Sequence, residues 1–346
     1  MLKSLCFPSA RSGLFFLFAF LLAFPLCGAE PDMEELTAAA EKGDIQAQIT
    51  LGRSYLYGKN GVDKDPAVGT RWIRKAADQN DPEAQYLFGR CFDVGRGLEQ
   101  NPASAVFWYE KAANQGYPRA ELSMAACCFN GYGVEKNPDE GVKWLRRAAD
   151  HGLAEAQCRL GECYEKAEGV AADLAESAKW YRKAAEQGLA EAQHRLGMFY
   201  MTAKGELRKD AAEGARWLRK AVDQGHTEAQ YQCGKCFARG RGMRENPAGA
   251  AQWYRTAAEK GHAKAQFSLG ICYLDGFGVT RDAAEGVEWI RKAADQNLPE
   301  AECRLARCYE NGEGVDADPA EAAAWYPRAA GHGSAAAKEK LAELGK

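Results

Sequence analysis

The chain has 346 residues, enough for two ordinary domains or for one long repeat array. Its 45 basic and 48 acidic side chains nearly cancel, so bulk charge gives no sign of a nucleic-acid binder. Hydrophobic residues make up 46% of the chain, yet the mean hydropathy is −0.47. These values are typical of a soluble protein with thin apolar stripes and argue against a bundle of membrane helices.

Residues 1–29 differ in composition from the rest and predict a secretory signal peptide. A start that carries Lys3 and Arg11 precedes an apolar run of 14 residues, and cleavage is expected after Ala29. The run is short for a membrane span of roughly 20 residues, so an uncleaved anchor is the weaker alternative. A bulky residue before Cys27 argues against a lipoprotein. We expect an exported protein, periplasmic or extracellular, or in a eukaryote one of the secretory pathway.

After this segment, one unit of about 36 residues is written eight times. All eight tryptophans share one register, 36 residues apart with one step of 37: Trp72, Trp108, Trp144, Trp180, Trp217, Trp253, Trp289 and Trp325. An alanine opens each unit, which gives the predicted repeats 1 to 8 as residues 47–83, 84–119, 120–155, 156–191, 192–228, 229–264, 265–300 and 301–336. We expect every tryptophan to be wedged between the helices of its own repeat and those of the next.

Each repeat predicts two helices. The first carries apolar residues at helical spacing after the opening alanine and ends at glycines. The second has a predicted N-cap seven residues before the tryptophan: Asp65, Asn101, Asn137, Asp173, Asp210, Asn246, Asp282 and Asp318. It has a predicted stop eight residues after the tryptophan: Asn80, Gly116, Gly152, Gly188, Gly225, Gly261, Asn297 and Gly333. Because one hairpin cannot bury its apolar face alone, we expect an all-α solenoid with capping helices at 30–46 and 337–346.

Two phrases carry a family resemblance: "AQFSLGICYLDGFGV" at 265–279 and "WYRKAAEQG" at 180–188. They resemble the Sel-1-like repeats, relatives of tetratricopeptide repeats, and the resemblance covers nearly all of residues 30–346. It implies a right-handed superhelix of antiparallel helix pairs. It also implies a non-catalytic scaffold or adaptor that binds a protein or peptide along its concave face. The family carries no universal catalytic residue.

A longer period lies above the repeat. Repeats 1 and 5 are 37 residues long, and repeats 4 and 8 share a cysteine motif, "EAQCRLGECYEKAEGV" and "EAECRLARCYENGEGV". We infer that a block of four repeats, 145 residues long, was duplicated as a whole. The two cysteine motifs are then copies of one feature, so their similarity says nothing about use.

The ten cysteines after the signal segment all fall in first helices. Six share the position seven after the opening alanine: Cys91, Cys127, Cys163, Cys236, Cys272 and Cys308. Phe199 takes that position in repeat 5, so we expect a core site in which cysteine acts as a small hydrophobe. The "CGKC" pair, Cys233 and Cys236, suggests a redox or zinc motif, but no second pair completes a zinc set. Mostly free, buried thiols are favoured, and bridges between neighbouring first helices stay open as an alternative.

No pattern of catalytic residues is present. The sequence has neither the S-x-x-K nor the G-x-S-x-G spacing of serine hydrolases. His151 and His332 stand where other repeats favour glutamine, His226 and His262 follow helix-stop glycines, and His194 lies alone in a first helix. We therefore expect no enzyme, no cofactor and no metal site. The alternative is a weak hydrolase of β-lactam or cell-wall compounds, as named for some cysteine-rich relatives.

The resemblance places the first helices on the concave face. The outward positions would be three, six and ten after the opening alanine, where two acidic residues, Glu162 and Asp275, stand against nine basic ones. The predicted partner-binding residues are those nine: Arg53, Arg90, Arg159, Lys166, Arg195, Lys235, Arg239, Arg304 and Arg307. A concave surface of one sign attracts ligands of the other, so we expect an acidic protein or peptide segment, or an anionic glycan, bound by a monomer, and neither nucleic acid nor membrane. The alternative is a set of solvated arginines neutralised by neighbours such as Asp93, Glu165 and Glu310.

Overall fold

The computed structural model describes residues 32–204 and 207–344, and the predicted signal peptide lies outside them. The described residues form eighteen α-helices and no strand. Bounds: α1 Met33–Glu41, α2 Ile45–Tyr57, α3 Pro66–Asp78, α4 Pro82–Val94, α5 Pro102–Asn114, α6 Pro118–Asn130, α7 Pro138–Asp150, α8 Ala154–Lys166, α9 Leu174–Glu186, α10 Ala190–Thr202, α11 Ala211–Asp223, α12 Thr227–Arg239, α13 Pro247–Glu259, α14 Ala263–Asp275, α15 Ala283–Ala294, α16 Pro299–Asn311, α17 Pro319–Gly331 and α18 Ala335–Leu344. Each even-numbered helix from α2 to α16 is the first helix of a repeat, and the odd-numbered helix after it is the second.

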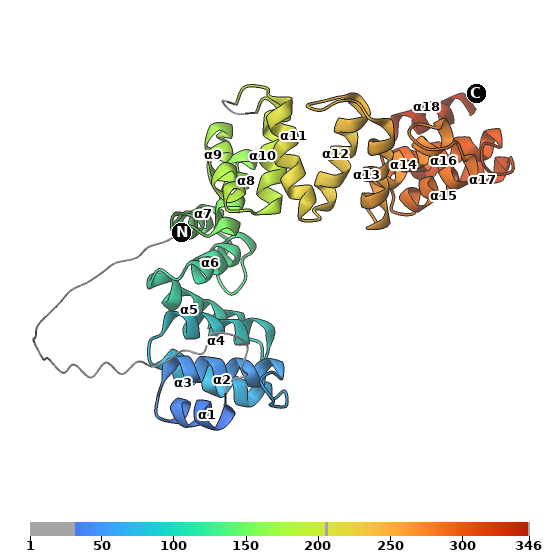
Figure 1. The fold of residues 1–346 in the computed structure, drawn as a ribbon. Helices are drawn as coiled ribbons and strands as arrows, with labels where there is room; N and C mark the ends of the chain where they lie inside the picture. The colour runs from blue at the N-terminus through green and yellow to red at the C-terminus, as the bar shows by residue number, and fades with distance from the viewer. Residues whose placement is uncertain (1–31, 205–206, 345–346) are drawn as a thin grey trace, which may run out of the picture.

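The helices stack in chain order as an all-α solenoid, as predicted. Each first helix packs against the second helix of its own repeat, and each second helix packs against the first helix of the next. Figure 1 shows two arms, one from α1 to α7 and one that runs from α10 to α18, with a bend near α8 and α9. Within the described ranges, no helix has the length and apolarity to cross a membrane.

The caps of the second helices explain their regular boundaries. All eight predicted Asp or Asn side chains accept hydrogen bonds from backbone N–H groups of the first helical turn. The predicted Gly or Asn stops all have positive φ, between 60° and 106°. Caps of this kind stabilise a helix by about 1 kcal/mol each. The first helices begin two residues before the opening alanine, at Ile45 in repeat 1 for example.

Glycine is required where the loop between the two helices touches the preceding repeat. At Gly97 φ is +73°, and an added Cβ would lie 2.0 Å from the carbonyl oxygen of Pro66. A different glycine permits the tight crossing inside the hairpin, because a Cβ on Gly161 would lie 2.9 Å from the Tyr181 ring. The register of repeats is therefore fixed by backbone contacts that no larger residue allows.

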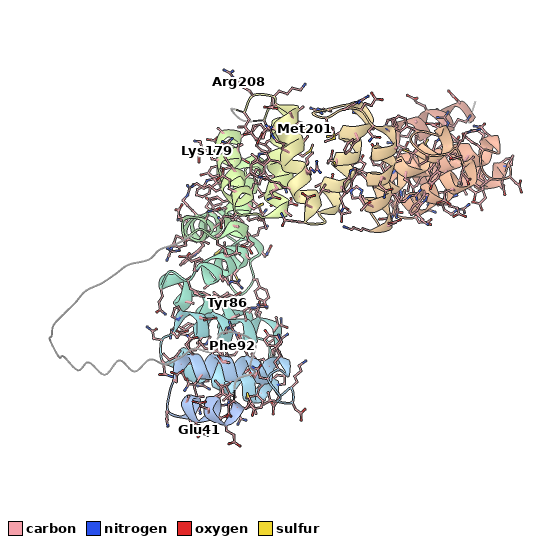
Figure 2. All side chains as sticks on the ribbon, viewed as in Figure 1. Glu41, Tyr86, Phe92, Lys179, Met201 and Arg208 are labelled. Carbon is pink, nitrogen blue, oxygen red and sulfur yellow. The ribbon has the colours of Figure 1, made fainter. Side chains whose placement is uncertain are left out.

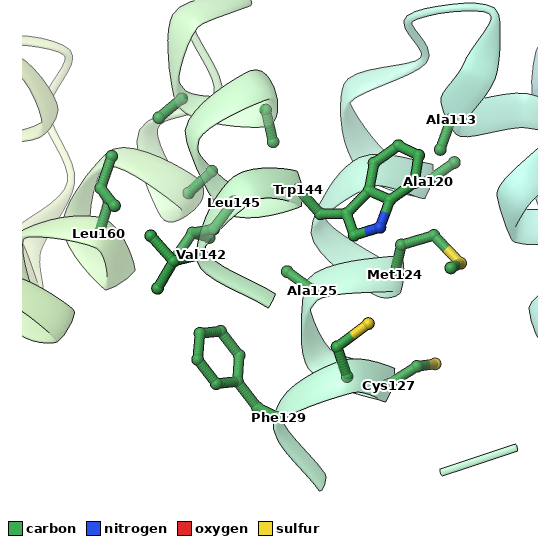
Figure 3. Packing of buried hydrophobic residues seen from close by; sticks show 14 of the residues in the cluster. Ala113, Ala120, Met124, Ala125, Cys127, Phe129, Val142, Trp144, Leu145 and Leu160 are labelled. Carbon is green, nitrogen blue, oxygen red and sulfur yellow. The ribbon is translucent and has the colours of Figure 1, made fainter. Parts of the chain in front are cut away.

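The tryptophans pack differently from the prediction. Trp144, Trp180 and Trp325 are buried and the other five are half-buried. Figure 3 shows the Trp144 ring beside Ala113 of α5 and Ala120 and Met124 of α6, so it faces the preceding repeat and its own first helix. Other tryptophans follow Trp144, since Trp217 packs against the cluster of repeats 4 and 5 and Trp253 against that of repeats 5 and 6. The expectation that each tryptophan contacts the next repeat is therefore wrong.

The residue after each tryptophan makes the contact with the next repeat. Ile73 of repeat 1 clusters with Ala84 and Phe88 of repeat 2, and Leu218 of repeat 5 clusters with Cys233 of repeat 6. All eight residues at this position are at most 6% exposed. Successive helical side chains point about 100° apart, so the tryptophan can face the preceding repeat while the residue after it faces the following repeat. In seven repeats a Lys or Arg three residues on covers the tryptophan ring, 3.9–4.8 Å from its centroid.

Candidate functional site

The nine predicted partner-binding residues are all exposed or half-buried, and Figure 2 shows side chains projecting along both arms. Five of the nine are held in ion pairs. Arg53 contacts Glu83 at 2.5 Å and Arg304 contacts Glu313 at 2.8 Å. Arg159 pairs with Glu162 and Glu168 at 2.7 Å, Lys166 pairs with Glu162, and Arg195 pairs with Glu191 at 2.5 Å. Much of the positive charge expected on this surface is thus neutralised.

The three carboxylates suggested as partners that neutralise the arginines bind tyrosine hydroxyl groups instead. Asp93, Glu165 and Glu310 accept hydrogen bonds from the hydroxyl groups of Tyr109, Tyr181 and Tyr326, at 3.1, 2.9 and 2.6 Å. Each of these tyrosines follows a tryptophan in the second helix of the same repeat. The acids therefore fasten the first helix to the second, and none of the three is paired with a predicted partner-binding residue.

Repeat 6 breaks this pattern. A tyrosine, Tyr254, follows its tryptophan, as in repeats 2, 4 and 8. Ala238 stands where those three repeats have Asp93, Glu165 and Glu310. Among the described residues, nothing forms a hydrogen bond with the Tyr254 hydroxyl. A hollow of about 530 Å³ lies here between α12 and α14, lined by Ala238, Arg239, Tyr254, Phe267, Ile271 and Phe277, among others. The missing carboxylate leaves the Tyr254 hydroxyl free on the wall of this hollow.

The hollow is partly apolar, and its lining carries charges of both signs. Arg239 lines it, and with Lys235 also lines a smaller hollow of about 70 Å³ between α10 and α12. Within the described ranges, neither cation forms an ion pair. Burial lowers the pKa of Lys235, and the charge of Arg239 lowers it further. Asp275 is the acidic residue in the lining of the larger hollow.

The other two unpaired cations lie elsewhere on the same surface. Arg90 lines a narrow hollow between α2 and α4 with Tyr57 and Val94, two exposed apolar residues. Arg307 forms no ion pair among the described residues. The predicted set thus divides into five paired side chains and four unpaired ones, of which Lys235 and Arg239 lie together.

A row of buried polar residues, one position after the opening alanine, was not predicted from the sequence. In five repeats a glutamine there accepts a hydrogen bond from a glutamine at the end of the second helix, as Gln48 does from Gln79 at 2.8 Å. In repeats 3 and 8 a fully buried glutamate replaces the first glutamine, and Glu121–His151 and Glu302–His332 replace the pair, each at 2.8 Å. The conspicuous histidines at these two positions are therefore structural partners of buried glutamates.

The other three histidines lie close to carboxylates of first helices. His226 caps α12 and contacts Glu191, and His262 caps α14 and contacts Glu228, both at 2.8 Å. His194 is buried in α10 against the ring of His226. In the part of the chain that the structure describes, donor atoms of Glu191, His194 and His226 form the one group that lies close enough together to hold a metal ion.

All ten cysteines in the described ranges are free and buried. Burial, and to a lesser extent the neighbouring Cys236, raises the pKa of Cys233 to about 12. A redox-active thiol needs the opposite shift, because the thiolate is the reactive form. The Cys233–Cys236 pair therefore has the environment of core residues.

The comparison with known families agrees with this geometry. The Sel1 repeat model matches residues 45–81, 82–117, 118–153, 154–189, 190–226, 227–262, 263–298 and 299–334. The chain belongs to the Sel1 repeat family. Sel1 repeats generally form non-catalytic scaffolds that mediate protein interactions.

Two solved Sel1-type structures resemble the chain along most of its length. A protective antigen of uropathogenic Escherichia coli strains is 32% identical, with a TM-score of 0.81 over 91% of this chain and 67% of that one. A Sel1 repeat protein from Oxalobacter formigenes is 29% identical, with a TM-score of 0.67 over 90% of both chains. A segment of 68 residues, 20% of this chain, is 29% identical to HRD3A of Arabidopsis thaliana, an ERAD-associated E3 ubiquitin-protein ligase component, and spans 10% of that protein.

Proposed function

We propose that this Sel1 repeat protein is a non-catalytic scaffold whose monomer binds an acidic protein or peptide segment. The hollow beside Ala238 is the observation that carries the proposal. It offers apolar walls from Phe267 and Phe277, a free tyrosine hydroxyl, and the cation Arg239, which it shares with the smaller hollow that Lys235 lines. A peptide with an apolar side chain beside carboxylates would satisfy all three features.

The unpaired cations Lys235 and Arg239 support an anionic partner more strongly than the full predicted set does. A cation already held by a carboxylate 2.5–2.8 Å away contributes little net field. Two cations without an ion pair among the described residues, Arg239 in the lining of the hollow and Lys235 one turn before it on α12, attract an anion and set its orientation. The binding site proposed here is thus smaller than the surface predicted from the sequence, and it is centred on repeats 6 and 7.

Peptide selection tests this function directly. Random peptides displayed on phage are selected on the immobilised protein at low salt, and the affinities of the enriched peptides are measured in solution. We expect enrichment in Asp and Glu beside an apolar residue. The Lys235→Glu, Arg239→Glu double variant should weaken binding at least about tenfold. As a control, Arg71→Glu with Arg119→Glu reverses two exposed cations away from the hollow. Equal binding to the first variant and the wild type would refute the proposal.

The hydrolase alternative is tested with the same purified protein. Hydrolysis of a chromogenic β-lactam that a single substitution abolishes would favour it over the scaffold. The buried, high-pKa thiols and the structural histidines give no nucleophile–base pair for such a reaction.

We further propose that the protein is exported, to the periplasm or the outside of the cell. The basic and then apolar composition of residues 1–29 supports this. The test is N-terminal sequencing of the protein from the exported fraction, with Glu30 as the expected first residue. Detection of the protein only in the cytosol with Met1 retained would contradict export.

A further inference from the structure

Three side chains with metal-binding groups meet between the first helices of repeats 5 and 6. Glu191 and His194 lie one turn apart on α10, and His226 is the N-cap of α12. The Nε2 atom of His226 lies 2.8 Å from a carboxylate oxygen of Glu191, and the rings of His194 and His226 stack with centroids 5.1 Å apart. One donor atom from each residue lies within 4.8 Å of the other two.

His194 has no hydrogen-bond partner for either ring nitrogen among the described residues, although it is only 8% exposed. A buried polar group without a partner is costly, so such groups in native proteins need an explanation. The same position, two residues after the opening alanine, holds other residue types in the other repeats: Ile49, Tyr86, Leu122, Cys158, Tyr231, Phe267 and Cys303. An imidazole in this place is therefore not demanded by the packing of the repeat.

Repeat 6 contains the same arrangement without the third ligand. Glu228 contacts His262 at 2.8 Å, and the ring of His262 lies 4.9 Å from that of Tyr231. Tyr231 takes the place of His194. The glutamate–histidine contact and the ring stacking are thus common to both repeats, and the additional imidazole is what distinguishes repeat 5.

We propose that Glu191, His194 and His226 bind one Zn²⁺ ion that fastens α10 to α12. Two imidazole nitrogens and a carboxylate oxygen are a ligand set that zinc accepts, with water in the fourth position. Zinc–ligand bonds of about 2.0–2.1 Å separate tetrahedral ligands by about 3.4 Å, so binding draws the three donors together. Calcium and magnesium prefer oxygen ligands and are disfavoured.

The neighbouring groups fit this role. Arg195 holds the other oxygen of Glu191 at 2.5 Å and would orient the carboxylate toward the ion. In the structure, Nδ1 of His226 accepts a hydrogen bond from the Ala229 N–H. A metal ion at Nε2 of His226 would replace the hydrogen bond to Glu191 and move the ring proton to Nδ1, which could then no longer accept. That cap is lost on binding, a loss that the fold tolerates because α6, α8, α10 and α16 have no side-chain cap.

The test measures Zn²⁺ binding by calorimetry to the full chain after removal of metals with EDTA. We expect one site per chain in the wild type. His194→Tyr, which copies repeat 6, should bind Zn²⁺ at least about tenfold more weakly, because changes in outer-shell partners alone typically cost that much. Glu191→Gln is a second ligand variant, and His262→Gln is the matched control that should bind as the wild type does. Far-ultraviolet circular dichroism establishes that each variant is folded.

Two further readouts locate the ion. Zn²⁺ should shift the Ala229 amide resonance in the wild type and not in His194→Tyr. Co²⁺ in place of Zn²⁺ should give visible absorption bands without a sulfur charge-transfer band. Equal affinity in the wild type and His194→Tyr, or a charge-transfer band that assigns the metal to Cys233 and Cys236, would overturn the proposal.

Discussion

The two blocks of four repeats, residues 45–189 and 190–334, share one framework and differ in what is placed on it. Residues 145 positions apart occupy the same place: Trp180 and Trp325 are both buried, and Tyr109 and Tyr254 both follow a tryptophan. Asp93 corresponds to Ala238. The lining of the hollow differs between the blocks at this position and at others, since Phe267 and Phe277 stand where the first block has Leu122 and Tyr132.

The histidine sites differ in the same way. His194 in the second block corresponds to Ile49, and the Glu121–His151 pair of the first block corresponds to Gln266–Gln296. The apolar positions are constrained by both neighbours in the stack, whereas one polar pair affects only its own junction. A duplicated solenoid can therefore acquire different sites in its two halves at little cost to the fold.

The largest loss of stability should come from replacing Trp180 or Trp325, which hold equivalent positions in the two blocks. Trp180→Ala should lower the free energy of unfolding by about 3–5 kcal/mol, because it empties a site between two repeats. Trp325→Ala should cost less, since the last repeat has one neighbour fewer and carries Pro327 inside α17. Hydrogen exchange should show faster opening of the wild-type array around Trp325 than around Trp180. Equal protection of the two repeats would contradict this order.

The next effect concerns the row of buried polar residues. His151→Ala removes a hydrogen bond from the buried, charged Glu121 and should cost about 1.5–3 kcal/mol. Gln296→Ala, the equivalent change in the second block, removes a bond between neutral groups and should cost about 0.5–1.5 kcal/mol. Urea unfolding of both variants gives the comparison. Equal losses would mean that the buried charge adds nothing to this contact.

Exchanging alanine and glycine at the ends of α8 and α16 should change the free energy of unfolding by about 1 kcal/mol in opposite directions. Ala167 ends α8 with φ +57°, and its counterpart Gly312 ends α16 with φ +67°. A side chain is strained in the left-handed region by about 1–2 kcal/mol, and glycine is not. Ala167→Gly should therefore raise the midpoint of thermal unfolding and Gly312→Ala should lower it. A loss of stability in Ala167→Gly would show that packing of the alanine methyl group stabilises the fold by more than the backbone strain at this position destabilises it.

The smallest effect is expected for the core thiols near neutral pH. Burial raises the pKa of Cys158 and of Cys233 to about 12. The folded state thus holds these protons more tightly than the unfolded chain, whose thiols ionise near pH 8.5. Stability from this source is complete below that pH and is lost as the pH rises from about 8.5 through about 12.

Alkylation with iodoacetamide at pH 8 provides the measurement. The thiols of the native protein should react slowly, and most of the ten should react after addition of denaturant without reductant. Cys236→Val should fold normally. Five disulfides found by mass spectrometry would contradict the free-thiol state.

The repeats were predictable because each determinant of the fold lies within one repeat. The N-cap of α3, the glycine at the end of α4 and the apolar spacing of α8 are all set by residues a few positions apart. The sequence did not predict which neighbouring repeat each tryptophan contacts, because this depends on how adjacent hairpins are rotated against one another.

The site was only partly predictable, because its contacts join different repeats. The register showed which cations face outward, but Arg53 pairs with Glu83 across 30 positions and His226 meets Glu191 across 35. No local spacing carries that information. Arg159 and Arg195 prove to be ion-paired, so reversal of their charges would disturb the scaffold as well as any ligand. The hollow was not predictable either, because its lining comes from α12, α13 and α14 of two repeats.

We propose that the second block binds its partner beside Ala238, where the counterpart of the Asp93 carboxylate is missing. The most direct measurement is the affinity of a selected acidic peptide for Ala238→Glu, titrated in solution against the wild type. The new carboxylate should occupy the part of the hollow beside Tyr254, bond to Tyr254 as Glu165 does to Tyr181, and leave thermal stability unchanged or higher. We predict that affinity falls at least about tenfold, while Asp93→Ala, in the first block, binds as the wild type does. Undiminished binding to a folded Ala238→Glu variant would contradict the account.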